Sequence, residues 1–179
     1  IGQLLVLGLA LVLATIFAPW IAPADPYYQD FNAILLPPDW AHPFGTDSLG
    51  RDIFSRVLYG AGIDLQIGFI TTYVPMLYGV MLGAFSGYLG GIVDSVFMRI
   101  LDVAMAFPFL VLIIVILAIL GPGVQNIYIS VFLLAWTMYA RLARAEMLVE
   151  RTKDYMVAAK VLGYPTRRIV LRHGLPNVI

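Results

Sequence analysis

Charged residues suited to acid–base chemistry lie close together in the segment HPFGTDSLGRDIFSRVLYGAGIDL (42–65), which contains Asp47, Arg51 and Asp52. A carboxylate beside a guanidinium can transfer protons when its pKa is matched to the task. The same residue types form local ion pairs and helix caps far more often, and no nucleophile with a positioned base accompanies them. We therefore expect a structural role, in which Asp47 or Ser48 caps a following helix.

Metal, thiol and phosphate chemistry have few candidate residues in this chain. It has no cysteine, which excludes disulfides, thiolate nucleophiles and Cys-ligated metals. Its two histidines, His42 and His173, are widely separated, so we expect no histidine-based metal site. The phosphate-binding motif Gly-x-x-x-x-Gly-Lys-Ser/Thr is absent as well, so we expect that the chain binds no cofactor and is not an enzyme that hydrolyses ATP.

Lipid is the solvent that the composition indicates. The chain of 179 residues is 61% hydrophobic and 12% charged, whereas soluble domains are about 45–50% apolar and about 25% charged. This balance makes the lipid bilayer the expected partner, and the formal net charge of zero gives no bias toward a nucleic acid. Because lipid offers backbone polar groups no hydrogen bonds, we expect an all-α membrane protein built as a polytopic bundle of transmembrane helices.

Uncharged runs mark the expected spans. About 20 apolar residues cross the hydrocarbon core of a bilayer, and uncharged runs occupy 1–24, 65–93 and 103–140. The third run is long enough for two spans, and Gly121-Pro122-Gly123 predicts a tight turn within it. We therefore expect one transmembrane domain over residues 1–179, with spans at about 1–24, 65–87, 103–120 and 124–140.

The distribution of charge orients these spans. The loop 25–64 has six acidic and two basic residues, whereas the region 141–173 has eight basic and three acidic residues. Because cytoplasmic loops of membrane proteins are rich in Lys and Arg, we expect the loop 141–176 in the cytoplasm and the loop 25–64 outside. Within the outer loop, residues 53–58 have apolar side chains at helical spacing, which predicts an amphipathic helix on a membrane or protein surface.

Three glycines, Gly79, Gly83 and Gly87, recur every four residues in the second expected span. On a helix they form one stripe, which predicts that another helix packs closely against it. Glycine is also common in membrane helices without such a role. Of these two interpretations, close packing against another helix is the one that we favour. Pro75 in the same span removes a backbone donor and predicts a kink.

Charged residues border the third and fourth expected spans. Arg99 and Asp102 lie three residues apart before the third span, and we expect them to pair on one helical face. Arg141 and Arg144 end the fourth span as expected anchors, whose charged groups reach the polar surface of the bilayer. No ionisable residue lies in the middle of an expected span, which weighs against a proton-coupled carrier and an ion-selective pore.

The segment DYMVAAKVLGYPTRRIVLRHGLPNV (154–178) predicts two short helices joined by an elbow. The first helix follows Asp154 as its cap and ends at Gly163, and Pro165 starts a second helix over about 166–172. Small side chains let a partner backbone come close, and apolar and basic side chains offer anchors. The docking residues that we expect are Asp154, Tyr155, Val157, Ala158, Ala159, Lys160, Leu162, Gly163, Tyr164, Arg167 and Arg168.

This elbow resembles a loop of ABC-transporter permeases of the importer type, which reads Glu-Ala-Ala, three residues, Gly, nine residues, Ile, any residue, Leu-Pro. Here Val157-Ala158-Ala159 is followed at the same spacing by Gly163 and His173-Gly174-Leu175-Pro176. Val157 replaces Glu, and His173 replaces Ile. The strings HPFGTDSLGRDIFSRVLYGA and GYLGGIVDSVFMRILDVAMAFP resemble the peptide/nickel branch, so the chain is similar to the C-type permease of dipeptide and oligopeptide systems.

The resemblance implies more than the residues alone. Family members have six transmembrane helices, so two more would follow Ile179. They pair with a second, homologous permease in a bacterial or archaeal cytoplasmic membrane, and an extracytoplasmic binding protein delivers the substrate. The elbow would be the coupling helix, which docks on one of two cytoplasmic ATP-binding subunits that hold ATP and Mg. Peptides, nickel, glutathione and some sugars all fit as substrates.

Two other functions are weighed against this resemblance. In the first, the basic segment is an interfacial helix of a non-transporting membrane structural protein, and it would bind acidic vesicles without any ATPase. In the second, the chain is a membrane-embedded enzyme, which requires a convergent reactive set of side chains within the spans. The spans contain no such set, so the permease is the preferred reading.

Overall fold

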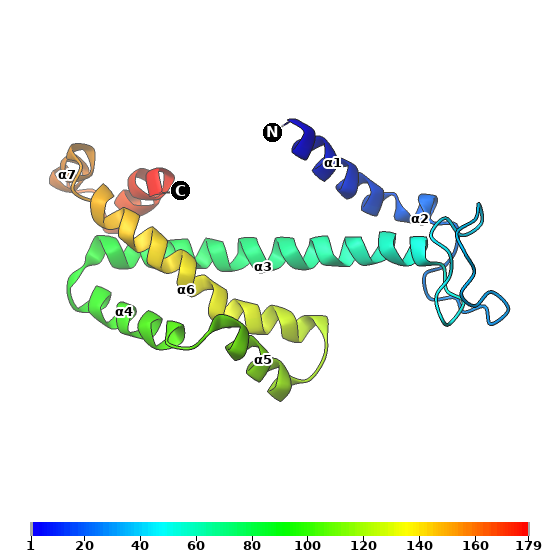
Figure 1. Cartoon of the computed structure of the whole chain (residues 1–179). Helices are drawn as coiled ribbons and strands as arrows, with labels where there is room; N and C mark the ends of the chain where they lie inside the picture. The colour runs from blue at the N-terminus through cyan, green and yellow to red at the C-terminus, as the bar shows by residue number, and fades with distance from the viewer. Residues whose placement is uncertain (1, 179) are drawn as a thin grey trace. The chain divides into compact units, whose positions relative to one another are not determined.

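A computed structural model describes residues 2–178 of the protein (Figure 1). These residues are mostly helical and contain no β-strand, and an isolated bridge pairs Thr46 with Asp52. The expected all-α fold class is therefore confirmed. The elements are α1 (Gly2–Ile16), α2 (Ala18–Ile21), α3 (Ile53–Leu89), α4 (Gly91–Met105), α5 (Phe109–Leu120), α6 (Val124–Glu150), α7 (Asp154–Val161), α8 (Thr166–Arg168), the π-helix η1 (Ile169–Gly174) and α9 (Leu175–Val178).

Two helices within the described residues are long and apolar enough to cross a membrane. They are α3, with 37 residues, and α6, with 27 residues. The pair α4 and α5 passes the same test together, but it is bent by 78° at the break between them, as in a broken span or a re-entrant loop. The apolar part of α1, Leu5–Ile16, is shorter. The count of four spans therefore stays a prediction.

The helix expected at 103–120 is broken in the structure. α4 ends at Met105, and α5 starts at Phe109 directly after Pro108. Pro108 donates no backbone hydrogen bond and disfavours the helical conformation at the residue before it, which explains the break. α5 has 12 residues, which corresponds to about 18 Å of helix and falls short of a bilayer core of about 30 Å.

Helix α3 begins earlier than the second expected span. It starts at Ile53, so the amphipathic stretch 53–58 forms its first turns and is not a separate surface helix. The helix continues through Pro75, which is fully buried, and ends at Leu89. The chain divides into two compact units, Ile1–Gly68 and Phe69–Ile179, and the boundary between them falls within α3.

The loop before α3 folds around buried polar residues. The Thr46 hydroxyl donates a hydrogen bond to the Ala33 carbonyl and accepts one of 2.8 Å from the Leu36 N–H. Asp52 directly precedes α3, and its carboxylate accepts the Ser55 N–H at 2.7 Å, which is the contact of a helix cap. The prediction that Asp47 or Ser48 provides the cap was wrong, because the helix starts later in the sequence.

Asp47 instead holds the turn that precedes this cap. Its carboxylate accepts the N–H groups of Leu49 at 2.8 Å and Arg51 at 3.0 Å, and it pairs with the guanidinium groups of Arg51 and Arg56. Desolvation acts to raise the pKa of Asp47, but these hydrogen bonds and the Arg51 charge outweigh it and lower the pKa from 3.8 to about 2. The charges of this loop therefore stabilise a turn.

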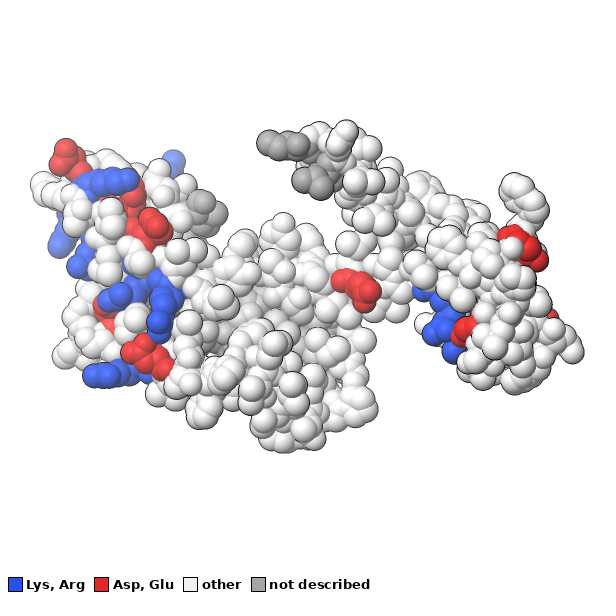
Figure 2. Space-filling view, in the orientation of Figure 1, with Lys and Arg blue, Asp and Glu red and all other residues white. Residues whose placement is uncertain are grey.

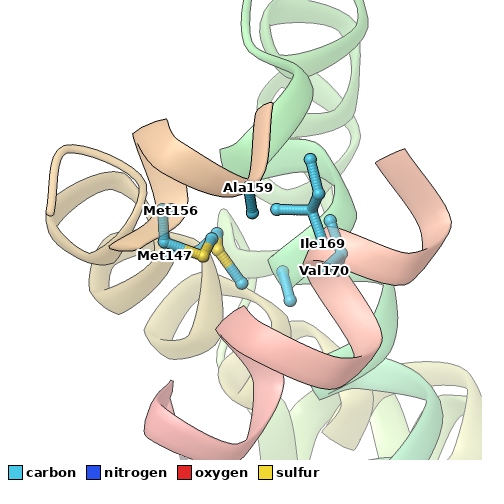
Figure 3. Packing of buried hydrophobic residues seen from close by; sticks show 6 residues of the cluster. Met147, Met156, Ala159, Ile169 and Val170 are labelled. Atoms are coloured by element: carbon cyan, nitrogen blue, oxygen red, sulfur yellow. The ribbon is translucent and has the colours of Figure 1, made fainter. Parts of the chain in front are cut away.

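In the second unit, a small core forms where α7 and η1 pack on α6. Met147 and Val170 are fully buried, and Met156 and Ile169 are each 1% exposed. Figure 3 shows these side chains and Ala159 pointing toward one another from α6, α7 and η1. The core therefore ties the short helices of the predicted elbow to the long helix α6.

Candidate functional site

The charged residues of the second unit gather at the end that carries α7 (Figure 2). Lys and Arg side chains are mixed there with Asp and Glu, whereas the rest of this unit is almost free of charge on the face that Figure 2 shows. Such a boundary between an apolar and a charged surface is typical of a helix bundle that leaves a membrane. The candidate site is therefore this polar end, and the helices that position it are α3, α4 and α6.

Helices α3 and α6 approach each other closely along the glycine stripe. A Cβ atom added at Gly79 would lie 2.6 Å from the Trp136 carbonyl oxygen, and one at Gly87 would lie 2.7 Å from the Arg144 carbonyl oxygen. A Cβ at Gly83 would come closer still to the Ala140 carbonyl oxygen. The absent side chains therefore let the backbone of α6 rest directly on α3.

Two arginines of α6 pair with carboxylates of α4. Arg144 meets Asp94 through two hydrogen bonds of 2.6 Å each, and the Ser86 hydroxyl of α3 donates a third hydrogen bond to this carboxylate at 2.8 Å. Arg141 meets Asp102 at 2.7 Å in a more exposed pair. The ion pairs thus fasten α4 to α6, so these arginines are more than the surface anchors that the sequence predicts.

The pair expected between Arg99 and Asp102 does not form. Asp102 pairs with Arg141 of α6 instead. Arg99 is exposed and forms no ion pair with a carboxylate of residues 2–178. Three residues on a helix bring two side chains near each other, but the partner helix offers Asp102 a closer cation. The prediction was wrong because it considered one helix alone.

Arg151 closes the turn between α3 and α4. Its Nη1 donates hydrogen bonds to the carbonyl oxygens of Gly87 at 2.9 Å and Tyr88 at 3.4 Å. These carbonyls belong to the last turn of α3, where backbone acceptors lack partners within the helix and a cation is favoured. The polar end thus joins the end of α3, the start of α4 and the end of α6 in one set of contacts.

The elbow after α7 has the geometry of a helix stop. Gly163 has a φ of +75°, which a residue with a side chain rarely adopts. The Gly163 N–H donates to the Lys160 carbonyl at 3.0 Å, and the Tyr164 N–H donates to the Ala159 carbonyl at 3.2 Å, which together form a Schellman motif. Asp154 is the first residue of α7 and not its cap, because the cap position falls on Lys153.

Most of the expected docking residues lie on the outer face of the elbow. Tyr155, Val157 and Leu162 are 40%, 49% and 70% exposed. Tyr164 is half-buried. Ala159 is only 5% exposed and packs in the core, so its expected contact with a partner is corrected to a contact within the chain. The other exposed members of the set are Asp154, Ala158, Lys160, Gly163, Arg167 and Arg168.

The helix expected over 166–172 is split into two forms. α8 ends at Arg168, and the wider π-helix η1 continues to Gly174. The Tyr164 ring stacks on His173 with ring centres 6.0 Å apart, and the Arg168 guanidinium lies 4.2 Å from the centre of the Tyr164 ring. These contacts hold the second arm of the elbow against the first.

A cavity of about 730 Å³ opens between α7 and the ends of α3 and α6. Its lining combines apolar side chains with hydroxyl groups and two cations, and it contains no carboxylate. Three of the expected docking residues contribute to it. The lining residues are Tyr88, Leu89, Arg151, Thr152, Met156, Val157, Lys160, Tyr164 and Thr166.

Comparison with known protein families identifies two matching profiles. The profile of the binding-protein-dependent transport system inner membrane component matches residues 79–179. The profile of the N-terminal transmembrane domain of oligopeptide transport permease C matches residues 4–38. Together the two matches include most of α1, most of the second unit and every expected docking residue.

Curated relatives match nearly the whole chain. The dipeptide transport system permease protein of Haemophilus influenzae is 40% identical over 100% of this chain and 62% of its own length. The probable D,D-dipeptide transport system permease protein of Escherichia coli is 40% identical over 94% of the chain and 58% of its own length. A glutathione transport system permease protein of Escherichia coli is 41% identical over 94% and 56%. The chain thus spans about three-fifths of the length of these relatives.

Proposed function

Because the chain belongs to the family of binding-protein-dependent transport system inner membrane components, we propose that it is the transmembrane subunit of an ATP-driven importer. Its helices would form part of the substrate path, and the elbow after α7 would dock on an ATP-binding subunit. ATP and Mg would be held by that subunit, since this sequence has no phosphate-binding motif. The family gives no support to the alternative of a non-transporting structural protein.

The observation that carries this proposal is the connection between the elbow and the long helices. α7 exposes one face and buries Met156 and Ala159 against Met147 of α6. α6 in turn rests on the glycine stripe of α3, with no side chains between their backbones at three places. A displacement of α7 by a partner would therefore move α6 and α3 together.

The remaining partners and the topology follow from the same proposal. A second, homologous permease would complete the path, two ATP-binding subunits would bind at the cytoplasm, and an extracytoplasmic binding protein would deliver the substrate. The loop 141–176 would face the cytoplasm and the loop 25–64 the outside of a bacterial or archaeal inner membrane, with four spans as the sequence predicts.

Short peptides are the substrate class that we favour. The relatives are named for dipeptide, D,D-dipeptide and glutathione transport, and each of these substrates is a short peptide. Uptake of a labelled dipeptide into proteoliposomes that contain the complete transport system tests this choice. Uptake of nickel or a sugar without any peptide uptake would refute it.

Substitution at the elbow tests the coupling role. Gly163→Pro cannot adopt a φ of +75°, because the proline ring fixes φ near −65°. We expect the variant to insert in the membrane while ATP hydrolysis no longer depends on substrate and transport is lost. Gly60→Ala is a matched control, since a Cβ at Gly60 meets no atom within 4 Å. Normal coupling in Gly163→Pro would show that the elbow does not transmit ATP hydrolysis.

A further inference from the structure

We propose that the cavity beside α7 receives an acidic side chain from the ATP-binding subunit and that Lys160 is its ion-pair partner. This inference rests on the proposed function and adds the charge of the partner residue to it. The cavity holds about 730 Å³, and its lining includes two cations, Arg151 and Lys160, and no carboxylate. An anionic group is the occupant that complements such a lining.

The two cations, Arg151 and Lys160, differ in whether their side chains already have hydrogen-bond partners. Arg151 already donates hydrogen bonds to the Gly87 and Tyr88 carbonyls at the end of α3. The Lys160 ammonium forms no hydrogen bond or ion pair with any of residues 2–178. Lys160 therefore has all three of its donors available to a group that enters the cavity.

The sequence before Lys160 explains why the described part of the chain offers it no carboxylate on the same helical face. Val157 lies three residues before Lys160, lines the same cavity and is 49% exposed. Residues three apart on a helix are neighbours, so the Glu of the family pattern at position 157 would place a carboxylate beside Lys160. With valine there, no residue of the described chain at that position pairs with Lys160, and a carboxylate of the partner can take this place.

The apolar side chains that the elbow exposes favour a protein over a lipid headgroup as the source of the anionic group. Directly after Lys160 in the sequence the elbow exposes two apolar side chains, Leu162 at 70% and Val161 at 81%. Apolar anchors around a charged pair are typical of protein–protein interfaces.

A charge-reversal series tests the inference in the complete transport complex, assembled in nanodiscs of neutral phosphatidylcholine. The affinity of the purified ATP-binding subunits for the permease is measured for the wild type, Lys160→Met and Lys160→Glu. Arg172→Met serves as a matched control, because Arg172 is an exposed cation of η1 outside the cavity lining. Vesicle binding with anionic phosphatidylglycerol is measured in parallel for the same variants.

We expect Lys160→Glu to weaken binding about tenfold or more, Lys160→Met to weaken it less, and Arg172→Met to leave it unchanged. An acidic-to-lysine substitution in the ATP-binding subunit should restore binding to Lys160→Glu. Affinities of all variants within twofold of the wild type would overturn the inference, as would an effect of Lys160→Met on phosphatidylglycerol binding alone. Absence of binding by the wild type would instead refute the proposed function.

Discussion

The Arg144 guanidinium of α6 donates two hydrogen bonds of 2.6 Å to the Asp94 carboxylate of α4, one from Nε and one from Nη2. The side chains are 23% and 13% exposed, so water screens this pair less than the pair of Arg141 and Asp102, whose side chains are 43% and 51% exposed. The two pairs link the same helices but differ in burial. They therefore allow a direct comparison of what burial does to an ion pair in this fold.

Asp94→Asn should destabilise the protein far more than Asp102→Asn. The first change leaves the Arg144 guanidinium without a charged partner in a part-buried site, which should cost less than the about 3–5 kcal/mol of a fully buried pair but more than the contribution of an exposed pair, which is below about 1 kcal/mol. Thermal unfolding of the purified protein in detergent measures both changes. Equal shifts in Tm for the two variants would contradict the role assigned to burial.

Gly83→Ala should separate α3 from α6. Its new Cβ would meet the Ala140 carbonyl oxygen at less than van der Waals distance, and backbone cannot turn away as a side chain can. We expect a lower Tm and new reactivity of a cysteine introduced at Ala140, which is fully buried in the native protein. Gly60→Ala, which fills open space, should change neither quantity. Unaltered stability of Gly83→Ala would mean that the close contact is not required.

Ala159→Leu and Leu162→Ala should separate folding from docking. Ala159 is 5% exposed against Met147 and Ile169, so a leucine overpacks this core and should reduce stability by about 1–3 kcal/mol. Leu162 is 70% exposed, so its truncation should leave Tm unchanged and weaken binding of the ATP-binding subunit. Tm and subunit affinity are measured on both variants, and the opposite pattern would place Ala159 in the interface.

The loop around Asp47 should loosen in acid. The pKa of Asp47 is lowered from 3.8 to about 2 in the folded loop, so this group stabilises the fold above pH 3.8, and its contribution is lost as the pH falls through about 2. Cleavage of the loop by pepsin, which is active in this range, should therefore increase from pH 4 to pH 2. Asp47→Asn should be cleaved readily at both values, and a wild-type loop that resists cleavage equally at both would refute the expectation.

Local patterns of the sequence were sufficient to predict several elements of the site. The turn at Gly163 depends on one residue type, and the stripe of Gly79, Gly83 and Gly87 depends on helical spacing, so both can be located without a structure. The break before α5 could also have been predicted from the sequence, since Pro108 lies within the expected span and proline stops a helix. The all-α class followed from composition alone.

Other features depend on contacts between distant parts of the chain. Asp94 and Arg144 are separated by 50 residues, and nothing in either local sequence indicates which cation the carboxylate meets. Ala159 carries the same small side chain as Ala158, but Ala159 is buried in the core with Met147 of α6 and Ile169 of η1, whereas Ala158 is exposed. The direction in which a short helix presents its small residues is thus a tertiary property.

The glycine contacts of α3 also determine how stiff the joint with α6 is. A contact between side chains can absorb a small displacement by changing rotamers, at little cost in free energy. At Gly79, Gly83 and Gly87 the nearest atom on α6 is a carbonyl oxygen of the helix backbone, which has no rotamers to change. Displacement of α6 along α3 would therefore require the two backbones to separate, so at these positions the two helices resist sliding and move as one piece.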